Sequence, residues 1–349
     1  MATSEPRVKA DIPAAAALFR TWWDGFRLSQ ATLVATKLGI PDLLADGPRA
    51  SADLAKTTGT HPVALFRLLR ALAAGGLLVM DAEQRFGLTP LGASLQRGVP
   101  GDLRAHILFQ HDRVYQVFGD LLYSVQTGKP AFDHLYGQSN WEWYATDAEA
   151  SAIHDESMAS ETNVMTAALL AAYDFSPFGT IVDVGGGSGA LLAAVLEATP
   201  TTRGVLFDLP FVVAEPHPAL RSPHLAERTT LVGGSFFDAV PAGGDAYLLK
   251  FVVHDWDDAH SAAILRACHA AMAGKGRLLV VDPVLPERVE ASPTTQFGSL
   301  MDLTMLVWTP NGRERTAAEF QTLLTNAGFV LTRIVPAMGP LCIIEAVPV

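Results

Sequence analysis

The stretch TIVDVGGGSGALLAAVLEATP, residues 180–200, decides the fold of this chain. It begins with a short apolar run, passes through a glycine-rich segment and ends in residues with helical spacing, which predicts a strand, a tight turn and a helix in succession. Gly185, Gly187 and Gly189 lie in the turn, where the absence of side chains lets a ligand approach the backbone. The sequence therefore predicts a ligand-binding loop between a buried strand and a helix.

Further strand patterns follow this unit and alternate with helical or loop segments. They are RGVLFDLP (203–210), DAYLLKFVVHDW (245–256) and GRLLVVDPVL (276–285). Such alternation predicts a parallel sheet with helices on both faces. The last two patterns, residues 329–337 and 340–347, are joined by a turn too short for a crossover helix. They must form an antiparallel hairpin, so the fold class is α/β with an antiparallel end.

Residues 12–100 have the pattern of a mainly helical winged-helix domain. We expect two helical stretches between residues 11 and 44, the second broken by Pro41, and a short helix over residues 52–57 capped by Ser51. A helix then begins at Pro62, and two short strands follow it. A winged helix either reads DNA or forms a dimer interface, and 11 cations against 8 anions within residues 1–100 favour the interface.

We therefore expect a winged-helix dimerisation domain over residues 12–100 and a second domain over residues 101–349. In the second, residues 101–172 are a helical region that covers the substrate, and residues 173–349 are the cofactor-binding catalytic core. A length of 349 residues agrees with two domains of ordinary size.

Composition excludes several classes of protein. With 49% hydrophobic and 17% charged residues the chain is not mainly disordered, and a net charge of −11 argues against broad binding to nucleic acid or anionic membranes. Cys268 and Cys342 are too few for a disulfide framework or a cysteine-based zinc site. Neither a signal peptide nor a long apolar run is present, which predicts a cytoplasmic protein.

The glycine turn alone does not identify the ligand. Gly185-x-Gly187-x-x-Ala190 also matches a dinucleotide fingerprint, and Asp208 would suit either ribose. Asp183 favours a ligand with an ammonium group, such as S-adenosylmethionine, because a pyrophosphate would be repelled by this carboxylate. A plain turn in which Asp183 caps the helix is the alternative.

Candidate chemical groups gather where the strands end. Lys250 interrupts an apolar strand and needs a partner, and His254 follows at the carboxyl edge, where open α/β sheets bind ligands. Asp282 ends the next strand, and Glu314 precedes a capping box at residues 316–319. Structural roles remain open for each: a satisfied histidine, Asp255 or Asp257 as a helix cap, and Glu314 as a surface charge paired with Arg313 or Arg315.

Four segments, in order, resemble the S-adenosylmethionine-dependent O-methyltransferases of the caffeate and hydroxyindole type, including bacterial natural-product enzymes. These segments are IVDVGGGSG (181–189), FDLP (207–210), KFVVHDWDD (250–258) and NGRERT (311–316). The resemblance implies a class I methyltransferase Rossmann-like sheet, a homodimer and a small aromatic acceptor. It implies His254 as general base flanked by Asp282 and Glu314. No metal is expected for methyl transfer from S-adenosylmethionine, because its sulfonium methyl group is already a good electrophile. The implied cofactor residues are Asp183, Gly185, Gly187, Asp208, Leu209, Ser235, Phe236 and Lys250.

Two residues depart from the family pattern. Ser235 stands where the family often has an Asp that contacts adenine, and Asp282 stands where plant members have the longer Glu. The resemblance also suggests acceptor-wall residues, for which core packing is the alternative: Met158, Met301, Asp302 and Met305. Three other functions stay open: a cofactor-binding relative with another reaction such as hydroxylation with decarboxylation, a ligand-sensing regulator, and a nicotinamide dehydrogenase. The acceptor and its methylated position cannot be read from the sequence.

Overall fold

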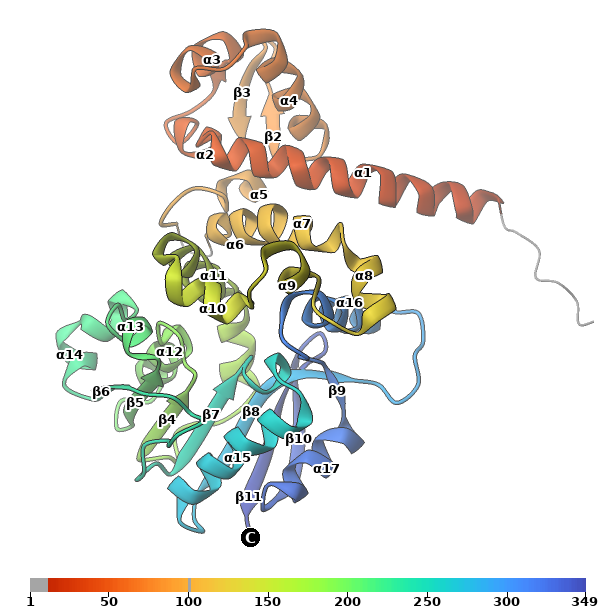
Figure 1. Ribbon diagram of the computed structural model, residues 1–349. Coiled ribbons are helices and arrows are strands. Elements are labelled where there is room, and N and C mark those ends of the chain that lie inside the picture. Colours follow the sequence, from red (N-terminus) through yellow and green to blue (C-terminus); the bar gives the residue numbers. More distant parts are fainter. Residues whose placement is uncertain (1–11, 100–101) are drawn as a thin grey trace, which may run out of the picture. The chain divides into compact units, whose positions relative to one another are not determined.

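The computed structural model describes residues 12–99 and 102–349 (Figure 1). The chain divides after Asp112 into two compact units. The domain limits expected from the sequence remain a prediction.

The N-terminal unit is mainly helical. Its helices are α1 (Ile12–Lys37), α2 (Ile40–Leu43), α3 (Ser51–Thr58), α4 (Pro62–Ala74), α5 (Pro90–Ala93) and α6 (Arg104–Leu108). A small antiparallel sheet has the order β1-β3-β2 and is made of β1 (Arg49–Ala50), β2 (Leu78–Met80) and β3 (Arg85–Leu88). Helices α3 and α4 followed by the β2–β3 hairpin are the winged-helix arrangement that the sequence predicts.

Two local predictions for this unit are wrong. The two helical stretches expected between residues 11 and 44 are present as α1, of 26 residues, and α2, but Pro41 does not break the second: the break falls at Gly39, whose φ of 66° is left-handed, and Pro41 lies in the first turn of α2. Proline is tolerated there because the first helical N–H groups have no partner within the helix. Ser51 is the first residue of α3 and not its cap, since Ala50 holds the N-cap position and no side chain caps the helix.

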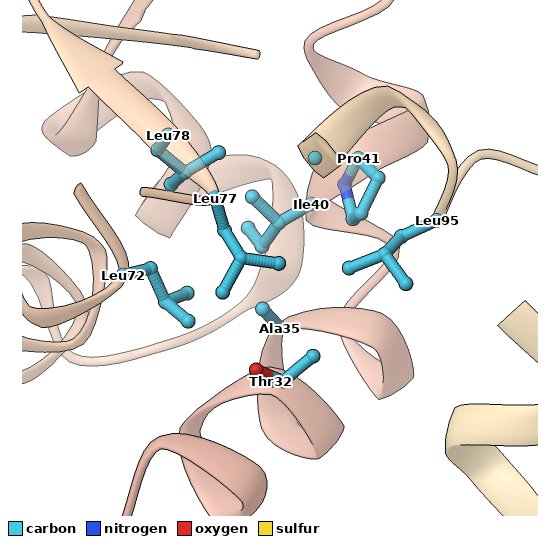
Figure 2. A pocket seen from close by; sticks show the side chains of 9 residues that line it. Thr32, Ala35, Ile40, Pro41, Leu72, Leu77, Leu78 and Leu95 are labelled. Atoms are coloured by element: carbon cyan, nitrogen blue, oxygen red, sulfur yellow. The ribbon is translucent and has the colours of Figure 1, made fainter. Parts of the chain in front are cut away.

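The core of the N-terminal unit is closely packed. Side chains from α1, α2, α4 and the β2 region converge on a cavity of about 10 Å³ (Figure 2). Ile40, Leu72 and Leu78 line it and are almost completely buried. A cavity of this volume holds at most one water molecule, so it is a packing defect and not a ligand site.

A series of helices opens the second unit. A π-helical segment over Phe109–Val114 leads into them, and they are α7 (Tyr115–Phe118), α8 (Leu121–Thr127), α9 (Ala131–Tyr136), α10 (Asn140–Thr146) and α11 (Ala148–Ala172). The sequence predicts a single interruption near residues 127–130. The structure has more of them, because Gly137 also ends a helix in a left-handed conformation and Asp147 begins another.

The sheet of the second unit has the order β10-β11-β8-β7-β4-β5-β6. Its strands are β4 (Thr180–Val184), β5 (Arg203–Asp208), β6 (Thr229–Gly233), β7 (Ala246–Lys250), β8 (Arg277–Leu285), β10 (Phe329–Met338) and β11 (Leu341–Pro348), with β9 (Arg315–Thr316) paired to β8. Strands β4 to β8 pair in parallel, whereas β10 and β11 form the predicted antiparallel hairpin.

Helices cover both faces of this sheet (Figure 1). Helices α15 (Asp258–Met272) and α17 (Ala317–Asn326) pack on one face, and α11 and α12 (Ala190–Ala198) pack on the other. The remaining helical segments are α13 (Pro210–Val213), η2 (Pro218–Arg221), α14 (Pro223–Ala226), η3 (Val253–Asp255) and α16 (Pro293–Trp308). The sheet is buried on both sides, which explains why its central strands read as continuous apolar runs.

One strand was predicted too long, and three were missed, namely β1, β6 and β9. The pattern at residues 245–256 ends as a strand at Lys250, because Phe251 turns the chain with a φ of 56°. Strand β6 has no apolar run because it lies at the edge of the sheet, where none of its residues is fully buried, and β1 and β9 have only two residues each. No helix among the described residues is both long enough and apolar enough to cross a membrane.

Candidate active site

The glycine loop between β4 and α12 lies against the segment that carries His254. Gly185, Gly187 and Gly189 have φ of 66°, 58° and 85°, a region that other residues rarely adopt. A Cβ on Gly185 would lie 2.8 Å from a methyl carbon of Val252, whereas one on Gly187 would meet open space. The loop is therefore closely packed on one side and open on the other, where a ligand could approach its backbone.

Asp208 closes this loop from the end of β5. Its two carboxylate oxygens accept hydrogen bonds from the N–H groups of Gly187 (2.8 Å) and Leu209 (2.7 Å). Burial raises the pKa of Asp208, although both N–H groups lower it. Each oxygen keeps a lone pair, so the carboxylate is held in one orientation in which it can accept hydroxyl groups of a ribose.

Asp183 is a buried carboxylate that lacks a partner. It is 1% exposed, and its Oδ2 has no hydrogen-bond partner among the described residues. Burial raises the pKa of Asp183 to about 7, against the opposing charge of Lys250. The alternative role as a helix cap is wrong, because Gly189 holds the N-cap position of α12. An unpartnered carboxylate oxygen beside a glycine loop fits the ammonium group of a ligand such as S-adenosylmethionine.

Aromatic side chains lie next to the loop after β6. Phe236 meets the Trp256 ring edge-on with centroids 6.2 Å apart, and Trp256 stacks on Trp141 of α10 at 5.9 Å. Ser235 forms a local turn, because its hydroxyl accepts the N–H of Phe237 at 3.2 Å. These rings could cover a flat group such as adenine, and Ser235 supplies no charge to it.

The sequence predicts a cofactor or a carboxylate as the partner of Lys250, and the described residues show no ion pair with a carboxylate, so contact with the cofactor stays a prediction. Lys250 is at the end of β7, and within the described residues no carboxylate lies within 4 Å of its ammonium group. Its Nζ instead lies 4.2 Å from the centroid of the Phe251 ring. Burial lowers the pKa of Lys250, and the charges of Glu161 and Asp183 oppose this effect.

His254 and Glu314 form a buried pair. The Nδ1–H of His254 donates to Oε1 of Glu314 at 2.8 Å, and the Glu314 side chain is inaccessible to solvent. The other ring nitrogen, Nε2, is 3.7 Å from Oδ1 of Asp255. Burial lowers the pKa of His254, but Glu314 and Asp255 outweigh burial and raise it to about 10. Burial raises the pKa of Glu314 to about 7, although His254 opposes this.

Asp282 supports the turn before His254, and no hydrogen bond joins it to the imidazole. Its Oδ1 accepts the N–H of Phe251 at 3.1 Å, while its Oδ2 has no partner among the described residues. Burial raises the pKa of Asp282, against the charge of His254. Phe251 in turn stacks on the His254 ring with centroids 5.1 Å apart. The shorter acid thus reaches the backbone beside the base and not the base itself.

The four acceptor-wall candidates have different surroundings. Asp302 accepts the N–H of Glu314 at 2.9 Å, which connects it to the site. Met305 is buried in α16, whereas Met301 and Met158 are half-buried in α16 and α11. Contact of these methionines with an acceptor stays a prediction.

Three residues of the site were missed by sequence reasoning. Asp255 was placed with His254 at the edge of the sheet but was given no role beyond a possible cap; Asp257 caps α15, and the Asp255 carboxylate faces Nε2 of His254. Burial raises the pKa of Asp255 to about 6. Phe251 stacks on the base. Arg315 is 1% exposed and binds Asp258 at 2.8 Å, so the alternative in which Glu314 is a surface charge paired with Arg315 is wrong. Only Asp255 had a signal, namely its position next to His254.

Across residues 12–99 and 102–349, no cluster of three or more His, Cys, Asp or Glu side chains could hold a metal ion. A family model described as an O-methyltransferase domain matches residues 118–330, and one described as an O-methyltransferase dimerisation domain matches residues 22–97. The chain belongs to the O-methyltransferase family.

Known relatives of this O-methyltransferase methylate several kinds of acceptor. The phenazine O-methyltransferase PhzM of Lysobacter antibioticus is 42% identical, over 93% of this chain and 94% of its own. The 8-amino-8-demethylriboflavin N,N-dimethyltransferase of Streptomyces davaonensis is 40% identical, over 88% of each chain. The family thus includes enzymes named for transfer to oxygen and to nitrogen.

The solved structure of one relative contains both a methyl donor and an aromatic ligand. An O-methyltransferase from neocarzinostatin biosynthesis, in complex with S-adenosylmethionine and 2-hydroxy-5-methyl naphthoic acid, superposes with a TM-score of 0.77 at 35% identity, covering 92% of this chain and 96% of its own. This O-methyltransferase uses S-adenosylmethionine as its methyl donor, in agreement with the unpartnered Asp183 and the glycine loop.

Proposed function

We propose that this enzyme transfers the methyl group of S-adenosylmethionine to a phenolic hydroxyl of a small aromatic natural product, with His254 as general base. The observation that carries the proposal is the buried hydrogen bond between His254 and Glu314, at the same edge of the sheet as the glycine loop. The named relatives act on aromatic natural products, which supports an acceptor of this class.

We expect different residues of the cofactor site to bind different parts of S-adenosylmethionine. We assign the ammonium group to Asp183, the ribose hydroxyls to Asp208 and the adenine to the rings near Phe236. When bound, the cofactor supplies a methyl group on a sulfonium sulfur, which is already a good electrophile. The protein is therefore left with two tasks: to align an acceptor oxygen and to remove its proton.

His254 is oriented for the second task. Because Nδ1–H is bound to Glu314, a neutral imidazole keeps its lone pair on Nε2, which can accept the proton of the acceptor hydroxyl. Phenols have a pKa near 10 and are mostly neutral at pH 7. The raised pKa of His254 makes it a stronger base, and Glu314 stabilises the imidazolium that forms. Asp255 and Glu314 then hold the charge of the imidazolium from two sides.

Replacement of His254 tests this assignment. We expect His254→Ala to lower kcat by about 10²–10⁴-fold, the usual contribution of a positioned base, while the affinity for S-adenosylhomocysteine is unchanged. The rate is measured by transfer of a radiolabelled methyl group, and the affinity by calorimetry. A variant with nearly full kcat and normal affinity would leave alignment of the reactants as the whole source of catalysis.

The acceptor itself is open to a screen. A panel of phenols, including hydroxyphenazines and hydroxynaphthoates, is incubated with S-adenosylmethionine, and products are identified by a mass increase of one methyl group. Matched arylamines in the same panel distinguish transfer to oxygen from transfer to nitrogen, because one relative is an N-methyltransferase. A homodimer and a cytoplasmic location remain part of the proposal, the former supported by the dimerisation-domain match.

A further inference from the structure

We propose that Asp302 is a positioning residue that acts through Glu314: by accepting the Glu314 N–H, it fixes the carboxylate that orients the base. The inference rests on the proposed role of His254 as general base. It also changes the meaning of Asp302, which the sequence suggested as part of the acceptor wall.

The side chain of Glu314 is held by its partner, but its backbone needs a partner too. Glu314 is 2% exposed, and a buried N–H without an acceptor is destabilising because it has lost its hydrogen bond to water. Asp302, in the third turn of α16, supplies this acceptor through Oδ1 at 2.9 Å. A carboxylate acceptor makes this hydrogen bond stronger than one between neutral groups.

The residues before and after Glu314 are hydrogen-bonded to the segment around His254. The Arg313 N–H donates to the backbone oxygen of His254 at 2.8 Å, and Arg315 donates to the backbone oxygens of Val253 (3.0 Å) and Trp256 (2.9 Å). Residues on both sides of Glu314 are thus tied to the segment that carries the base. Asp302 ties Glu314 itself to a different element, α16.

The start of the same loop is also fixed to the C-terminal end of α16. Thr309 accepts the N–H of Gly312 at 3.0 Å, and a Cβ on Gly312 would lie 2.6 Å from the backbone oxygen of His254. The loop is pressed so closely against the base that a small backbone shift must change the 2.8 Å contact between Glu314 and His254. Asp302 is the side chain placed to prevent this shift at residue 314.

The test compares two variants of Asp302. Asp302→Asn keeps an oxygen acceptor, so kcat should stay within about threefold of the wild type. Asp302→Ala removes the acceptor and should lower kcat by about 10- to 100-fold, the range seen when a supporting residue is lost, with little change in KM for S-adenosylmethionine. Should the Ala variant fail to fold, Asp302→Ser, whose hydroxyl is too short to reach, takes its place with the same expectation.

A double-mutant cycle with Glu314→Gln tests whether Asp302 acts through Glu314. We expect Asp302→Ala to cost less than about threefold in a Glu314→Gln background. The imidazole titration of His254, followed by NMR and assigned with His254→Ala, should move to lower pH in both single variants. Thr304→Ala, which removes an exposed hydroxyl from the same helix, should leave rate and titration unchanged.

Each outcome decides between the two proposals. Any one of three results would overturn the positioning role while leaving His254 as the base. They are an equal loss of kcat for Asp302→Ala in the wild-type and Glu314→Gln backgrounds, a clearly lower kcat for Asp302→Asn, and an unchanged His254 titration in Asp302→Ala. A Glu314→Gln enzyme with normal rate and titration would overturn the supported base, and the role of Asp302 with it.

Discussion

His254 and Glu314 form a pair whose charges should be visible in the pH dependence of the reaction. Because Glu314 and Asp255 outweigh burial and raise the pKa of His254 to about 10, the basic form grows as pH rises, and kcat should rise with pH through the neutral range. Glu314→Gln removes a negative charge from the imidazole. The rising limb of the kcat profile should therefore move to lower pH, and its plateau should fall by about tenfold or more, since the weaker base is also poorly oriented.

The measurement is a set of methyl-transfer rates between pH 6 and 10 in buffers of constant ionic strength. Glu290→Gln, which removes an exposed carboxylate, serves as the control and should follow the wild-type profile. A Glu314→Gln profile that moves to higher pH would contradict the electrostatic role of this pair.

Replacement of Asp183 by Asn should weaken cofactor binding but raise the stability of the protein without cofactor. Its pKa rises from 3.8 to about 7 on folding, so the stability contributed by its neutral form is complete below pH 4 and is lost as pH rises through 7. Without cofactor at pH 8, Asp183→Asn should therefore be more stable by about 1–3 kcal/mol, because an unpartnered charge is no longer buried.

The same substitution should weaken binding of S-adenosylhomocysteine by about tenfold or more, since a charged hydrogen bond is lost. Urea unfolding at pH 8 and calorimetric titration give the two values. Weaker binding together with lower stability would indicate general damage to the loop, and unchanged binding would remove Asp183 from the cofactor site.

At the scale of elements, α1 carries an exposed aromatic stripe that we expect to form the dimer interface. Phe19, Trp22, Trp23 and Phe26 share one side of the helix and are 44–66% exposed. Exposed apolar groups of this kind mark interaction surfaces, and the dimerisation-domain match begins at residue 22. Trp22→Glu and Phe26→Glu should therefore convert a dimer into a monomer at micromolar concentration, as measured by light scattering after gel filtration.

A matched control is available on the same helix. Asp24 lies on the side away from the stripe by helical spacing, so Asp24→Ala should remain dimeric. If Trp22→Glu is as dimeric as the wild type, the second copy binds elsewhere.

Elements were predictable where their own sequence determines them. The buried central strands and the hairpin followed from apolar runs and a short turn. Strand β6 could not be found, because an edge strand needs no apolar pattern, and the end of β7 was hidden because FVV after Lys250 is as apolar as the strand. At the turn, the Phe251 N–H is shared between the backbone oxygen of Val281 and the carboxylate of Asp282, both at 3.1 Å and both far away along the sequence.

The site was predictable in part of its membership and less so in its connections. His254 was named from its position at a strand end, the family resemblance added Glu314 beside it, and the two lie 2.8 Å apart. Asp282 and Asp302 were named too, but their partners are backbone N–H groups, which leave no pattern in a sequence. Arg315 was missed because a buried arginine in a charged loop resembles a surface residue until the carbonyl groups around it are known.

At the scale of the whole molecule, the net charge of −11 argues against DNA binding by the winged helix. Binding to DNA needs cations that neutralise phosphates, and the exposed residues Arg67 and Arg70 are the only cations of α4. We expect no binding to duplex DNA at about 10 µM protein and about 0.15 M salt, as measured by fluorescence anisotropy. Nanomolar affinity for a DNA sequence would contradict the dimerisation role and favour a regulator.

Phe251 has a consequence for anyone who wishes to make this enzyme more heat-resistant. A φ of 56° costs a non-glycine residue about 1–3 kcal/mol, so Gly or Asn at this position should relieve strain. Either change removes the ring that stacks on His254 and on which Lys250 rests. A screen that selects variants by melting temperature alone would therefore favour substitutions at residue 251 that loosen the imidazole, and it should be run with an activity filter from its first round.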